Sequence, residues 1–185
     1  MISSKPKPKN CKVCERAFTP ARPLQVVCGI VCARKVSKLK MKEEAENLKV
    51  RKEAVKRKPD LIREAQTAFN AYIRARDAGR NCICCDQPFE PQKPGGSVDA
   101  GHFRSRGAAP NLKFNEDNVF AQRKNCNRPG GTTYGRFREG VIKRIGLERV
   151  EDLEANNTPY KWTADELREI RDTYKRKLKE LEKSK

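Results

Sequence analysis

The stretch VDAGHFRSRG, residues 98–107, contains the only histidine among the 185 residues of the chain. His102 follows Asp99 by three positions, and two arginines and a glycine come after it. Histidine is the one side chain whose ordinary pKa lies close to neutral pH, so His102 is a candidate proton acceptor. It could also be an incidental surface side chain, and the flanking sequence has to decide between these two interpretations.

Short strand patterns and one helix pattern surround His102. Residues 97–103, SVDAGHF, and residues 117–122, DNVFAQ, have the composition of two short strands. Residues 134–146, YGRFREGVIKRIG, predict a helix that ends at Gly146. Its inward-facing residues are Phe137, Val141, Ile142 and Ile145. The histidine therefore lies on the first strand of a strand–strand–helix unit.

An incomplete set of cysteines encloses this unit. Cys82 and Cys85 form one C-x2-C knuckle, and Cys126 lies downstream of the second strand. A second knuckle would need a cysteine at position 123 or 129, where the chain has Arg123 and Pro129. Two interpretations stay open: a zinc site with an unidentified fourth ligand, or a degenerate site without metal.

A complete set of four cysteines lies near the N-terminus, as Cys11-x2-Cys14 and Cys28-x3-Cys32. This spacing is typical of a tetrahedral structural zinc, and the residues between Cys14 and Cys28 are long enough for a small hairpin. The first ten residues lack the apolar segment of a secretory signal, so we expect a cytoplasmic protein whose cysteines bind metal rather than form disulfides.

Three long segments have helical patterns. Residues 33–57 are rich in helix formers but too poor in apolar residues to be buried, and Pro59 interrupts them. Residues 60–79 carry a broad apolar face, and a last helix begins at Thr163 with a capping box to Glu166. The apolar stripe of that last helix comprises Leu167, Ile170, Tyr174, Leu178 and Leu181. We expect these two amphipathic helices to form a homodimer contact; the alternative is packing within one chain.

Positive charge is concentrated in two blocks. The formal net charge is +18, with 17 Lys/Arg against 5 Asp/Glu in residues 1–58 and 12 against 6 in residues 80–145. Residues 59–79 and residues 146–185 each have a net charge of zero. This distribution favours a nucleic acid as partner over an acidic membrane surface, and no apolar stretch is long enough to span a bilayer.

The region from Cys82 to Asn127 resembles the HNH nucleases. The order of its C-x2-C pair, DAGHF and CN motifs is similar to that of the variant with Asn in the last position, as in phage endonuclease VII, a junction resolvase. Over nearly its whole length, including DAGHFRSRGAAPNLKFNEDNV and KRIGLERVEDLE, the chain resembles the NinG recombination proteins of lambdoid phages.

The HNH resemblance implies a role for four residues. His102 would be the general base, Asn118 would orient the histidine strand or ring, and Asn127 would bind a catalytic Mg²⁺ or Mn²⁺. Family members usually carry an acidic metal ligand next to the histidine, where this chain has Gly101. Asp99 would have to supply that ligand, which needs a bulge or turn at Ala100–Gly101 because residues 99 and 102 face opposite sides of a regular strand.

The resemblance also implies the substrate and the domain plan. It predicts a divalent-metal-dependent endonuclease of the host bacterial cytoplasm that cuts branched DNA such as Holliday junctions and D-loops. The alternative is a non-catalytic zinc-module protein that binds DNA and recruits recombination or transcription factors. The basic residues expected to contact DNA are Lys5, Lys7, Lys9, Arg104, Arg106, Lys113, Arg123, Lys124 and Arg128.

The predicted fold is therefore α+β and mostly helical, with five parts. They are a flexible basic arm (1–10), a zinc-knuckle module (11–34), helical linker and packing helices (35–79), an HNH-like, treble-clef-related ββα-metal core (80–146) and a C-terminal helical region (147–185).

Overall fold

Pro59 marks where the first helical stretch divides. In the computed structural model, which describes residues 7–90 and 96–184, helix α1 spans Ile30–Ala54 and helix α2 spans Lys58–Arg76. Proline has no N–H to donate, so it is tolerated in the first helical turn, where that group lacks a helical partner. Pro59 accordingly lies in the first turn of α2. Both predicted helices are present, each beginning two or three residues earlier than predicted.

Backbone contacts divide the chain into two compact units. The first comprises Met1–Lys56 and the second Arg57–Lys185. The boundary falls inside the segment 35–79, so that α1 belongs with the cysteine module and α2 with the remainder of the chain.

The first unit contains a small hairpin and the solvated helix α1. Strands β1 (Lys9–Asn10) and β2 (Ala17–Phe18) pair antiparallel. The hairpin therefore encloses the first cysteine knuckle, whereas the sequence had suggested a hairpin between Cys14 and Cys28. Along α1 only Cys32 is buried, in agreement with a helix predicted to lack an apolar face.

The second unit is built around a two-stranded antiparallel sheet. Strand β3 (Val98–His102) pairs with β4 (Val119–Arg123), and both strands match the predicted segments. Two apolar clusters cover the two faces of this sheet. Phe120 packs with α3 (Tyr134–Ile145), α4 (Leu147–Ala155) and the Cys82 loop, and Val119 packs with α2 and α5 (Ala164–Lys183). A short 3-10 turn, η1 (Pro110–Leu112), lies between the strands.

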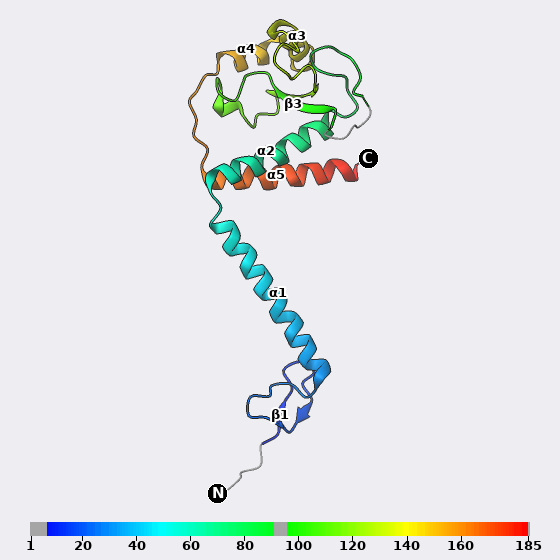
Figure 1. Cartoon of the computed structure of the whole chain (residues 1–185), viewed down its shortest axis with the longest axis vertical. Helices are drawn as coiled ribbons and strands as arrows, with labels where there is room; N and C mark the ends of the chain where they lie inside the picture. Colours follow the sequence, from blue (N-terminus) through cyan, green and yellow to red (C-terminus); the bar gives the residue numbers. More distant parts are fainter. Residues whose placement is uncertain (1–6, 91–95, 185) are drawn as a thin grey trace. The chain divides into compact units, whose positions relative to one another are not determined.

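Helices α2 and α5 lie side by side in one chain (Figure 1). Leu167 and Tyr174 of α5 are buried, and the Tyr174 ring contacts Phe69 of α2 edge-on with 4.7 Å between centroids. The capping box of Thr163 and Glu166 is present as predicted. The faces expected to form a dimer contact are thus used for packing within the chain, which was the alternative interpretation. A homodimer stays a prediction and would need another surface.

About half of the chain is helical, so the fold is a mixed α+β one. No helix in the described residues is long and apolar enough to cross a membrane.

Candidate functional site

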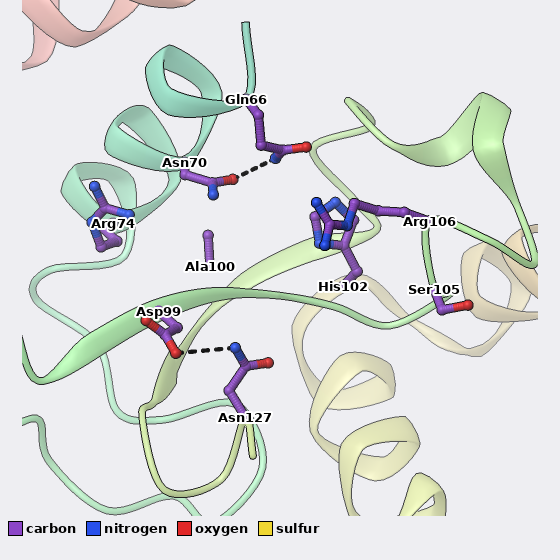
Figure 2. A pocket seen from close by; sticks show the side chains of 9 residues that line it. All are labelled: Gln66, Asn70, Arg74, Asp99, Ala100, His102, Ser105, Arg106 and Asn127. Carbon is purple, nitrogen blue, oxygen red and sulfur yellow. Dashed lines mark hydrogen bonds between the residues drawn. The ribbon is translucent and has the colours of Figure 1, made fainter. Parts of the chain in front are cut away.

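A pocket of about 470 Å³ opens at the free edge of β3, the strand that pairs with β4 alone among the described strands (Figure 2). Its walls come from α2, from β3 and the loop that follows, and from the turn after β4. The lining residues are Gln66, Asn70, Arg74, Asp99, Ala100, His102, Ser105, Arg106 and Asn127. The structure therefore brings together Asp99, His102 and Asn127, which the sequence had singled out.

Asp99 and His102 reach this pocket from opposite faces of a regular strand. The pairing runs without interruption from Asp99 opposite Gln122 to His102 opposite Val119, so the expected bulge at Ala100–Gly101 is absent. Successive side chains of a strand alternate between faces, and His102 accordingly lies on the α2 side with Ala100. The bulge is unnecessary because the pocket opens at the edge of β3, where both faces are accessible.

The hydrogen bond of the His102 ring fixes its tautomer. Nε2 lies 3.0 Å from the carbonyl oxygen of Lys113. A carbonyl oxygen only accepts, so Nε2 carries the proton and the lone pair of the neutral ring is on Nδ1. Burial lowers the pKa of His102 to about 4; the Lys113 carbonyl acts in the opposite direction, and the charges of Arg106 and Lys113 lower it further. The ring is therefore neutral, and able to accept a proton, at physiological pH.

Asn118 holds the chain segment that orients the histidine. Its side chain is fully buried. Its Oδ1 accepts from the Arg104 backbone N–H at 2.7 Å, and its Nδ2 donates to the carbonyl groups of Arg104 and Leu112 at 3.1 and 3.0 Å. Since Leu112 precedes the Lys113 carbonyl that receives the His102 bond, Asn118 positions the histidine through the backbone rather than through its ring.

Asp99 and Asn127 form a polar pair on the other face of β3. Asn127 Nδ2 donates to Asp99 Oδ2 at 3.0 Å, as Figure 2 shows. One carboxylate and one amide oxygen are hard ligands that suit Mg²⁺ or Mn²⁺, which keep several waters or phosphate oxygens in their shell. The two side chains fit such an ion once the Asn127 amide presents its oxygen in place of its nitrogen.

Gln122 holds the turn that carries Asn127. Its side chain is buried, and its Nε2 donates to Cys84 Sγ at 2.8 Å and to the Cys126 carbonyl at 3.3 Å. Its Oε1 would lie 1.9 Å from a Cβ atom at Gly101, so a side chain there would displace the Gln122 amide. Gly101 thus makes room for Gln122 and does not mark a bulge.

The N-terminal cysteines form a complete ligand set. The Sγ atoms of Cys11, Cys14, Cys28 and Cys32 all lie within 4.8 Å of one another, with Cys14–Cys28 at 3.5 Å and Cys28–Cys32 at 3.7 Å. Zinc lies about 2.3 Å from each sulfur, which places sulfurs about 3.8 Å apart in a tetrahedron. The cluster has the geometry to hold zinc.

The second cluster has three thiols. Cys82, Cys85 and Cys126 lie within 4.8 Å of one another, and no fourth cysteine, histidine or carboxylate joins them in the described residues. The backbone N–H of Arg123 donates to Cys82 Sγ at 3.2 Å, while its guanidinium is bonded to Glu90 and lies near Cys85. A cation therefore stands beside the thiols where a complete second knuckle would have a cysteine. The three thiols could still hold zinc, with its fourth ligand from outside this set.

The basic residues expected to contact DNA differ in their surroundings. Arg106 lines the pocket. The guanidinium of Arg104 is bonded to Asn157, and that of Arg123 to Glu90, so both have partners within the chain. Lys113 lies over the Phe114 ring at 5.3 Å. Among the others, Lys7 and Arg128 are exposed, Lys9 and Lys124 are partly buried, and Lys5 lies outside the described residues.

The α2 wall of the pocket was not predicted from the sequence. Gln66, Asn70 and Arg74 follow one another at intervals of four residues, which places them on one face of a helix. That spacing could have revealed a polar stripe beside the apolar one, although not what it faces.

Comparison with known proteins places the chain in a family. A sequence profile described as "Bacteriophage Lambda NinG protein" matches residues 3–184. The protein ninG of Escherichia phage lambda is 35% identical over 204 residues, covering 99% of this chain and 98% of that protein. The chain belongs to the NinG family. At this identity it is a relative of the lambda protein rather than the lambda protein itself.

Other NinG proteins match to a similar extent. Protein ninG of Escherichia phage 933W is 34% identical over 98% of this chain and 97% of its own length. Protein ninG of Salmonella phage P22 is 34% identical over 95% of both. No solved structure matches the chain.

Proposed function

We propose that this NinG protein is a divalent-metal-dependent endonuclease that cuts branched DNA during phage recombination. One observation carries the proposal: a neutral histidine with an oriented lone pair shares a pocket with a carboxylate–amide pair able to bind Mg²⁺ or Mn²⁺. The order β3, β4, α3 around them agrees with the resemblance to the ββα-metal core of HNH nucleases.

In this proposal the chain activates water for attack on a phosphodiester at the edge of β3. Nδ1 of His102 accepts a proton from the water as its oxygen bonds to phosphorus and the bond to the leaving oxygen breaks. The Lys113 carbonyl keeps Nε2 protonated, so the ring offers Nδ1 and no other basic atom. Asp99 and Asn127 would hold a divalent ion, which would supply charge stabilisation at the leaving oxygen.

The selection of branched substrates, such as Holliday junctions and D-loops, rests on the resemblance to phage junction resolvases. The second candidate is a non-catalytic zinc-module DNA-binding protein, which the N-terminal cluster and the basic charge favour. Such a protein has no use for a buried neutral histidine beside a carboxylate–amide pair, and we therefore prefer the enzyme.

Nicking of a synthetic four-way junction, compared with linear duplex of the same arms, tests the proposal. We expect Mg²⁺-dependent nicks in the junction and few in the duplex. Asn127→Ala should raise the Mg²⁺ concentration needed for half-maximal rate, whereas Asn125→Ala, an exposed neighbour that does not line the pocket, should not. A junction left intact by the wild-type protein at every Mg²⁺ and Mn²⁺ concentration would refute the endonuclease and favour the binding protein.

A further inference from the structure

A row of three polar side chains on α2 forms one wall of the pocket. Gln66, Asn70 and Arg74 lie along the helix above Ala100 of β3 in Figure 2. Steps of four residues advance about 6 Å along a helix, so the row is about 12 Å long. Ala100 of β3 lines the same pocket with its small side chain. The result is a polar groove that passes the free edge of β3.

The amide of Asn70 is available to a ligand. Gln66 Nε2 donates to Asn70 Oδ1 at 2.7 Å, which leaves the amide nitrogen of Asn70 turned toward the groove (Figure 2). Gln66 Oε1 is buried and has no hydrogen-bond partner among the described residues. Gln66 therefore orients the Asn70 amide, while its own Oε1 is shielded from a ligand.

Arg74 is the charged group of the row. It is half-buried, and no acidic residue pairs with it in the described part of the chain. Arg76, two residues further on, differs: its guanidinium bonds to Asp77 and to the carbonyl groups of Glu116 and Val119. Arg76 therefore serves the packing of α2, whereas Arg74 lines the pocket without an ion-pair partner among the described residues.

Cations stand at both ends of the groove. Arg74 lies at one end of the α2 row, and Arg106 lies beside His102 near Gln66 at the other (Figure 2). Between them are Asp99, His102 and Asn127. The guanidinium groups of Arg74 and Arg106 lie on either side of these three residues. Their charges match those of successive phosphates on one DNA strand.

We propose that the α2 row is a strand-binding wall, in which Arg74 binds a phosphate adjacent to the one that is cut. Asn70 donates to a sugar or phosphate oxygen of the same strand. The DNA strand that is cut passes through the groove between α2 and the free edge of β3. This inference rests on the proposed endonuclease function, since it identifies the binding surface beside the same site.

Binding of the full-length protein to a fluorescent four-way junction without divalent cations tests the wall separately from cleavage. Arg74→Gln should raise Kd by about 5- to 10-fold and lower the slope of log Kd against log salt by about one, which is the effect of one lost phosphate contact. Arg74→Lys should restore most of the slope because it keeps the charge. Arg176→Gln, the same charge change on an exposed position of α5, should leave Kd and slope close to wild type.

Emission of Trp162, the only tryptophan, reports whether each variant is folded. If folded Arg74→Gln binds as tightly as Arg176→Gln and with the same salt slope, the proposed wall is wrong even though the protein cuts DNA. If wild-type protein binds with the predicted Arg74 dependence but never cuts, the endonuclease proposal fails and the wall stands as a binding surface.

Discussion

The two units of this chain are stabilised in different ways. In the first, the only buried residues of the described part are Cys11, Pro20 and Cys32, while Ile30 and Leu39 remain well exposed. In the second, two apolar clusters cover both faces of the β3–β4 sheet, and the three-thiol group lies at the border of one of them. Hydrophobic burial stabilises in proportion to area, so packing stabilises the second unit, whereas we expect the first to depend on a metal bound by its four cysteines.

The largest effect should come from removing zinc. A strong chelator, or Cys11→Ser, should unfold residues 7–32, because a structural zinc of this kind contributes about 10 kcal/mol or more. Trp162 belongs to the second unit, and its emission should hardly change. Two-dimensional ¹H–¹⁵N spectra would show collapse of the N-terminal signals with the others in place. Well-dispersed N-terminal signals in metal-free protein would show that the first unit does not need a metal to fold.

Acid should destabilise the second unit through His102. Its pKa is about 4 in the folded protein against 6.5 ordinarily, so the unfolded chain binds the proton first. The stability contributed by the neutral ring is complete above pH 6.5 and is lost as pH falls toward 4. The loss reaches about 3 kcal/mol.

Urea unfolding followed by Trp162 emission at pH 7 and pH 4 measures this difference. Between pH 7 and pH 4 the free energy of unfolding should fall by about 3 kcal/mol more for the wild-type protein than for His102→Gln, because the variant lacks the titrating group. Equal losses would mean that the His102 ring is not held neutral in the folded state.

Two glycines of α3 sharpen the claim that packing stabilises the second unit. A Cβ at Gly140 would lie 1.8 Å from the Ile83 backbone carbonyl, whereas Gly135 has open space around it. Gly140→Ala should therefore destabilise the unit by about 1–3 kcal/mol, since α3 must move away from the Cys82 loop. Gly135→Ala should stabilise it by up to about 1 kcal/mol through helix propensity. Thermal melts of the two variants should shift in opposite directions; a shift in the same direction would show that α3 does not pack against Ile83.

Local patterns in the sequence predicted most of the elements. Composition indicated the strands around His102 and Val119, and the capping box at Thr163 marked the start of α5. Such signals act within a few residues, so they survive without knowledge of the fold. The absence of a fourth cysteine at position 123 could likewise be seen from the sequence alone.

The pocket could not be predicted in the same way, because its walls come from distant segments. No residue near Asn70 in the sequence indicates that α2 lies over β3. The apolar face of α2 predicted only that this helix packs against another element. Alternation correctly placed Asp99 and His102 on opposite faces, but the inference of a bulge followed from assuming that the pocket lies on one face. The partners of Arg104 and Arg123, Asn157 and Glu90, were likewise set by tertiary contacts.

In the proposed function, the second unit contains a hydrolytic site whose base is His102. Single-turnover nicking of a four-way junction with Mg²⁺, by wild type and by His102→Ala checked for folding through Trp162, tests it most directly. We expect the rate to fall by at least about 100-fold while the Kd for the junction changes little, because the base acts in the chemical step. Nicking by folded His102→Ala at the wild-type rate would contradict the account.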